Sequence, residues 1–159
     1  MAAILINDLI RQINELHDGS LWFDQSFNDK VGTLSDKEVF LQPHPQLHSV
    51  AEHVSHMLEW RKECILRFKG GKRELMELPE DWKTNEELKR FGWQQLKDDF
   101  NSSRNDLIQL IEGKDDEFLN TPFRNYEYNH HYLIEGILQH DIYHMGQIGI
   151  TLKLLSTSG

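Results

Sequence analysis

The chain has 159 residues, a formal net charge of −9 and a single cysteine. This length is enough to bury a core without disulfide bonds, and one cysteine cannot form an intramolecular disulfide, so nothing indicates an oxidising compartment. The acidic charge argues against general nucleic-acid binding and against docking on anionic membranes, because both need clustered lysine and arginine.

The N-terminal segment is typical of an amphipathic helix over residues 2–16. It lacks the basic start and long apolar stretch of a signal peptide, and no run approaches the roughly 18 apolar residues that cross a bilayer, so a cytoplasmic protein is expected. Gly19 indicates a break or bend, and the stretch around Trp22 and Phe27 could continue the helix to Gly32. The apolar positions that repeat every three to four residues are Ile4, Leu5, Leu9, Ile13 and Leu16.

A second helix is predicted over residues 49–68. Ser49 can cap it, with Glu52 at the matching position of a capping box, and Gly70 and Gly71 end it. The preceding segment, 34–48, contains two prolines and is predicted to be mostly connection. A short helical turn there could be capped by Ser35 with Glu38.

A long loop over residues 72–84 should lead to the third helix. Thr84 and Glu87 form another candidate capping box, and the apolar spacing then carries the helix to about residue 112, with Gly113 as its stop. Gly92 lies near the start, so a kink or two separate pieces are expected there.

The last helix is predicted over residues 129–155, after a connection over 115–128. Residues 121–128 could hold a short extended piece at most. No other strand pattern, repeat or flexible linker is visible, so the whole chain, 1–159, is predicted to be one all-α domain. Four helices of this length pack most simply as a bundle.

The histidine pair His140 and His144 is the first chemical signal. The two lie four residues apart on the last helix, so their rings project from one face, one turn apart. Ile137 and Ile148 share that face, which therefore points inward. Buried imidazoles need partners. One shared metal ion would satisfy both, but so would hydrogen bonds to buried carbonyl groups or water, and the spacing alone does not decide.

The same segment differs from the zincin signature H-E-x-x-H by Asp141 in place of glutamate. In zincins that glutamate is the general base and the next ligand lies downstream. Residues 145–159 contain no histidine, aspartate, glutamate or cysteine. A metalloprotease is therefore excluded, and a third ligand must come from upstream.

Two upstream histidines, His53 and His56, lie on the predicted second helix, where a ligand is held more firmly than on a loop. Cys64 is two turns beyond His56, roughly 12 Å along the axis, and is expected to be a buried structural thiol. Composition and spacing leave the choice of third ligand open. The upstream candidates are His17, His44, His48, His53, His56, His130 and His131.

Two segments together resemble a known family. The run SVAEHVSHMLEW over residues 49–60, followed some eighty residues later by GILQHDIYHMGQI over residues 136–148, is similar to the DinB-like superfamily. Its relatives include YfiT-type metal-dependent hydrolases and bacillithiol transferases. The resemblance covers nearly the whole chain, including Trp22, Trp82 and Trp93.

This resemblance implies a DinB/YfiT-like four-helix bundle with up-up-down-down order and a long crossover between its second and third helices. It also implies a metal site made of His56, His140 and His144 near one end of the bundle. The family's helix-two histidine precedes an apolar pair, which matches His56 before Met57 and Leu58. His53 falls where the family usually has an aliphatic residue, so it either lines the pocket or is itself the ligand.

Three imidazoles and an open position are typical of catalytic rather than structural zinc. The resemblance therefore implies a hydrolase or a bacillithiol-type thiol transferase acting on a small molecule, with zinc as the default ion and nickel as an alternative. It also implies a homodimer. There are two other hypotheses: a non-catalytic module that the metal stabilises, and a bundle whose histidines hold no metal.

No catalytic residue is assigned from the sequence. Supporting groups could be Glu59, Asp141, Tyr143 or Gln147, but each has a plainer role as a surface charge or a helix contact. Asp141 follows a ligand on the helix and is expected to point away from the metal. The tryptophans and the segment 126–128 could line a pocket over the metal or pack in the core or a dimer.

Overall fold

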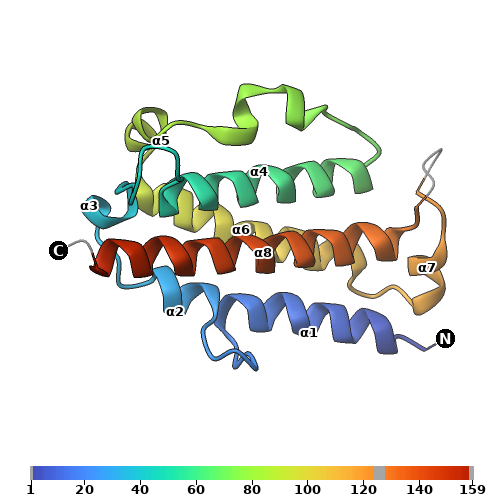
Figure 1. Cartoon of the computed structure of the whole chain (residues 1–159). Helices are drawn as coiled ribbons and strands as arrows, with labels where there is room; N and C mark the ends of the chain where they lie inside the picture. Colours follow the sequence, from blue (N-terminus) through green and yellow to red (C-terminus); the bar gives the residue numbers. More distant parts are fainter. Residues whose placement is uncertain (1, 124–127, 158–159) are drawn as a thin grey trace.

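The fold is all-helical over the part of the chain that the computed structural model describes, residues 2–123 and 128–157. Its four long helices lie side by side (Figure 1). They are α1 (Ile4–Asp18), α4 (Val50–Phe68), α6 (Trp93–Ile111) and α8 (His130–Thr157). Helices α1 and α4 each pack against both α6 and α8, so the apolar faces of all four meet in one core.

The order of helix directions corrects the up-up-down-down prediction. The backbone N–H of Ile4 at the start of α1 donates to Asp116, beyond the end of α6, whereas His17 in its last turn contacts Asn101 in the middle of α6. Helices α4 and α6 run in one direction, and α1 and α8 run in the other (Figure 1). The order is therefore up-down-down-up.

Two connections explain this order. The segment 19–49 joins the end of α1 to the start of α4 at the same end of the molecule, so these helices are antiparallel (Figure 1). The segment 69–84 then returns along the length of α4, as the predicted crossover does. The hydroxyl of Ser49 donates to the amide oxygen of Asn85 at 2.7 Å, which holds the starts of α4 and α5 (Asn85–Phe91) together.

The predicted capping boxes at the starts of these helices are confirmed. The hydroxyl of Ser49 accepts from the backbone N–H of Glu52, whose carboxylate accepts from the backbone N–H of Ser49. The same reciprocal pair joins Thr84 and Glu87 at the start of α5. Gly92 then separates α5 from α6, and its φ of 97° is a conformation that glycine adopts most readily.

The predicted continuation of the first helix to Gly32 is wrong. Helix α1 ends at Asp18, and a new capping box at Ser26 begins the separate short helix α2 (Phe27–Val31). Trp22 between them is fully exposed, so it makes no core contact that would stabilise a continued helix there. The predicted turn capped by Ser35 is present as α3 (Asp36–Val39).

The crossover and the last connection contain short helical turns. The crossover holds η1 (Leu75–Glu77) and η2 (Pro79–Trp82), and α7 (Asp116–Asn120) precedes α8. Pro122 and Asn129 form an isolated antiparallel bridge, which fits the short extended piece predicted there. Residues 124–127, with Tyr126, lie outside the described residues.

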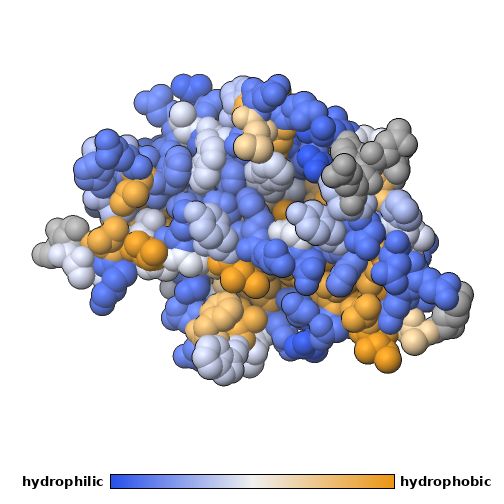
Figure 2. All heavy atoms as spheres, turned by 45° about the vertical axis from the view of Figure 1, so that its right-hand side comes forward, coloured by the Kyte–Doolittle hydropathy of each residue, from blue (hydrophilic) through white to orange (hydrophobic). Residues whose placement is uncertain are grey.

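One face of the molecule is mostly polar (Figure 2). Figure 2 shows a face on which hydrophilic residues predominate and apolar residues gather in patches in its lower half. None of the described helices combines the length and the apolar character needed to cross a membrane.

Candidate metal centre

Three histidines from two helices form a cluster. His56 lies on α4, and His140 and His144 lie on α8; each offers a ring nitrogen, and these three nitrogens lie within 4.8 Å of one another. The shortest separation is 3.1 Å, between Nε2 of His56 and Nε2 of His140. The predicted candidate set is thus together in space, and the cluster could hold a metal ion.

The local fold accounts for this arrangement. His140 and His144 project from one face of α8 because they are one helical turn apart. On the same helix, Ile137 and Ile148 are buried, so packing holds this face against α4. Because α4 and α8 are antiparallel neighbours, His56 meets both rings from the opposite side.

His56 is held by the crossover segment. Its Nδ1 donates to the backbone carbonyl oxygen of Asp81 at 2.8 Å, and the indole of Trp82 stacks on its ring with centroids 4.0 Å apart. The indole N–H of Trp60 donates to the Asp81 carboxylate at 2.9 Å. With the proton on Nδ1, the lone pair of neutral His56 is on Nε2, the atom that faces His140.

Burial keeps the rings of His56 and His144 neutral. It lowers the pKa of His144 to about 3, with further lowering from the neighbouring histidines, and it lowers the pKa of His56, an effect that the Asp81 carbonyl opposes. A neutral imidazole is the form that binds a metal ion, so no proton has to be removed from these two rings at neutral pH.

The donor set fits a divalent ion. Nδ1 of His140 and Nδ1 of His144 are both buried without a hydrogen-bond partner among the described residues. Tetrahedral zinc with Zn–N distances of about 2.0–2.1 Å separates its ligand nitrogens by about 3.3 Å, close to the 3.1 Å between His56 and His140.

His53 lies beside the cluster without being part of it. Its ring centroid is 5.5 Å from that of His144 and 5.6 Å from that of Trp82. Burial, together with the neighbouring His48 and His56, lowers its pKa to about 4. His53 is therefore placed as a neutral neighbour, with its Nδ1 buried and unpaired.

Other upstream candidates lie elsewhere. His17 lies in the last turn of α1 and is buried, and its Nε2 accepts a hydrogen bond from Arg61 at 2.6 Å. His130, at the start of α8, contacts Thr121. His48 stacks on Trp82 at 3.8 Å and lines the cavity next to the cluster.

The cluster opens into a cavity of about 510 Å³, called the metal cavity below. Tyr143 and Gln147 line it, and the amide nitrogen of Gln147 donates to the Tyr143 hydroxyl at 3.3 Å. The other lining residues are His48, His56, Trp60, Met76, Asp81, Trp82, His140 and His144.

Asp141 and Glu59 point away from the metal cavity. The carboxylate of Asp141 accepts from the buried guanidinium of Arg61 at 2.7 Å. Glu59 forms ion pairs with Lys62, Arg73 and Lys83. As expected, Asp141 is turned away from the cluster, and Glu59 is a buried, paired charge rather than a solvated one.

The sequence reasoning missed Asp81. It gave pocket lining as one of two roles for the tryptophans, and Trp60 and Trp82 do line the metal cavity, but their contacts with Asp81 and His56 were not foreseen. Their contacts depend on how the crossover folds back on α4, which local periodicity does not encode. The available signal was an aspartate–tryptophan pair in the loop, directly after Pro79 and Glu80.

A comparison with models of protein families shows which family the chain belongs to. The family model for the DinB superfamily matches residues 25–148, most of the chain. The chain belongs to the DinB superfamily. All three clustered histidines lie within the matched residues of this DinB protein, whereas Trp22 lies before them. No match was found among curated proteins or among solved structures.

Proposed function

We propose that this DinB protein binds one divalent metal ion through His56, His140 and His144 and uses it to act on a small molecule. The observation that carries the proposal is the convergence of three imidazoles, one fixed by the Asp81 carbonyl, at a cavity of about 510 Å³. Zinc is the default ion and nickel the alternative, because imidazole ligands suit both.

The reaction class is hydrolysis or thiol transfer. A divalent ion in an open site supplies Lewis-acid chemistry, which polarises a carbonyl group or activates water or a thiol. Around it, Trp82 and Asp81 fix the orientation of His56, and the Tyr143 hydroxyl and Gln147 amide offer hydrogen bonds to a bound molecule. Asp141 and Glu59 are excluded as bases by their ion pairs.

Substitution of single histidines tests the ligand set. Protein purified without a polyhistidine tag is loaded with zinc, dialysed and examined by elemental analysis. The variants H56A, H140A and H144A should each lose most of the bound metal, whereas H53A should keep about one ion per chain. Metal retention by H56A, or metal loss in H53A alone, would show that the assignment is wrong.

A second function is favoured by the position of the site. The ligands join α4 to α8, so a bound ion could serve only to tie the two helices together. Chelation separates the proposals. A fall in Tm on chelation, without turnover of activated esters or of thiol acceptors by the loaded protein, favours the structural role. Turnover that chelation abolishes and that zinc restores favours the enzyme.

A further inference from the structure

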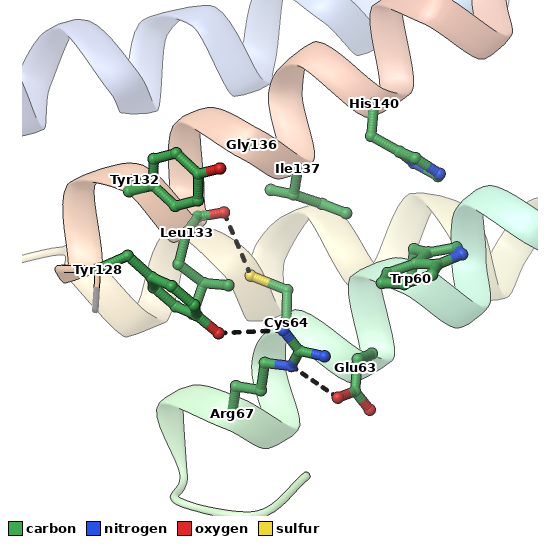
Figure 3. Close-up of a pocket in the computed structure, with 10 residues that line it drawn as sticks. All are labelled: Trp60, Glu63, Cys64, Arg67, Tyr128, Tyr132, Leu133, Gly136, Ile137 and His140. Atoms are coloured by element: carbon green, nitrogen blue, oxygen red, sulfur yellow. Dashed lines mark hydrogen bonds and ion pairs between the residues drawn. The ribbon is translucent and has the colours of Figure 1, made fainter. Parts of the chain in front are cut away.

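A second cavity lies between α4 and α8, next to the metal cavity. It has a volume of about 230 Å³ and is called the apolar pocket below. Figure 3 shows His140 and Trp60 at one end of it and Tyr128 and Arg67 at the other, with Cys64 between them. The complete lining is Trp60, Glu63, Cys64, Arg67, Tyr128, Tyr132, Leu133, Gly136, Ile137 and His140.

The walls of the apolar pocket favour an uncharged occupant. The Arg67 guanidinium donates to the Glu63 carboxylate at 2.7 Å and to the Tyr128 hydroxyl at 3.1 Å, so its charge is already paired. Burial raises the pKa of the Cys64 thiol to about 12, and the thiol contacts the Leu133 carbonyl oxygen at 3.9 Å. Cys64 is therefore a neutral wall residue and not a nucleophile.

The two cavities adjoin at Trp60 and His140, which line both of them. We infer that the apolar pocket binds the apolar part of the substrate while the polar end of the same molecule lies at the histidine cluster. This inference rests on the proposed function. The volume is below the roughly 300–1,000 Å³ of sites for drug-sized ligands, so the group it accepts is a short aliphatic chain or a single aromatic ring.

Gly136 keeps the apolar pocket open. It lies inside α8, and a Cβ atom placed on it would meet no other atom within 4 Å. An added side chain therefore starts in open space, and a large one would fill volume of the pocket that Gly136 lines. Gly146, on the same helix, has equally free surroundings but lines neither cavity, which makes it a matched control.

Hydroxamates test the inference in the zinc-loaded protein, because a hydroxamate binds the ion and carries a variable tail. By titration calorimetry, benzohydroxamate should bind roughly tenfold or more tightly than acetohydroxamate, since its ring gains apolar burial. In G136L this advantage should vanish with bound zinc unchanged. G146L should retain it. G136M provides a second filling variant, with circular dichroism as the check on folding.

A second measurement does not depend on the metal. Toluene added to metal-free protein should shift the methyl NMR signals of Leu133 and Ile137, and G136L should abolish the shifts. Equal affinity of the two hydroxamates, or shifts that persist in G136L, would overturn the inference although zinc still binds. Failure of zinc to bind, with the toluene shifts present and lost in G136L, would instead defeat the proposed metal function and leave the pocket supported.

Discussion

At the scale of single residues, the guanidinium of Arg61 is a charge buried between the four long helices. It donates to the Asp141 carboxylate, to the backbone carbonyl of Phe100 and to the Ser103 hydroxyl, and its Nη1 lies 2.6 Å from Nε2 of His17. Three long helices besides α4 contribute these partners. A buried charge is tolerated because nearly every donor has an acceptor.

Asp141→Asn should destabilise the protein by about 3–5 kcal/mol, because it leaves the Arg61 charge buried without its carboxylate partner. Urea unfolding of the metal-free protein measures the change. Asp8→Asn is the control, since it breaks an exposed ion pair with Arg11 and should have little effect. A loss in Asp141→Asn no larger than in the control would mean that solvent reaches Arg61.

At the scale of elements, the starts of helices could be predicted where the capping residues lie close together in the sequence. Ser49 with Glu52 and Thr84 with Glu87 are local patterns, so the starts of α4 and α5 could be read from four residues each. Gly92 likewise marked the division between α5 and α6. The separate helix α2 was missed although its start is also a local capping box, because Asp29 stands where the usual pattern has glutamate or glutamine.

Gly92→Ala tests the division between α5 and α6. The φ of 97° and ψ of 136° at this position are strained for any residue with a Cβ, so the free energy of unfolding should fall by roughly 1–3 kcal/mol. The matched variant Gly136→Ala, inside α8, should instead be neutral or gain about 0.5–1 kcal/mol, because glycine is costly in a helix interior. Equal effects in urea unfolding would contradict the assigned conformation.

At the site, too, residues close in sequence could be predicted, whereas contacts between distant segments could not. His140 and His144 could be paired from their spacing alone, and the resemblance selected His56. The Asp81 carbonyl and the Trp82 ring could not be placed, because the crossover that carries them packs against α4 through contacts distant in sequence. The partner of Arg61 was hidden for the same reason, since Asp141 lies 80 residues away on another helix.

At the scale of the whole molecule, the up-down-down-up order determines where the polar groups meet. Because α1 and α8 both run opposite to α4, the last turn of α1 brings His17 to Arg61, and the middle of α8 brings Asp141 to the same point. The cation of Arg61, its carboxylate partner Asp141 and the neutral imidazole of His17 thus meet in the core of this acidic protein. That imidazole links global stability to pH.

His17 should make the protein sensitive to acid. Burial, and after it the charges of Arg61 and Arg104, lowers its pKa from 6.5 to about 2. The neutral ring donates from Nδ1 to Asn101 and accepts at Nε2 from Arg61. Below pH 6.5 the unfolded chain binds a proton that the folded chain excludes, so this stability is complete above pH 6.5 and declines as pH falls toward 2, by about 1.4 kcal/mol per unit.

His17→Gln removes this titration while keeping an amide that can donate to Asn101 and accept from Arg61. Urea unfolding of both metal-free proteins between pH 6.5 and 4.5 should show a shallower loss of stability in the variant, by up to about 1.4 kcal/mol per pH unit. His53, His56 and His144 titrate in both proteins, so their contribution cancels in the comparison. Parallel pH profiles would mean that His17 accepts a proton in the folded state, and that the contact with Arg61 is open to water.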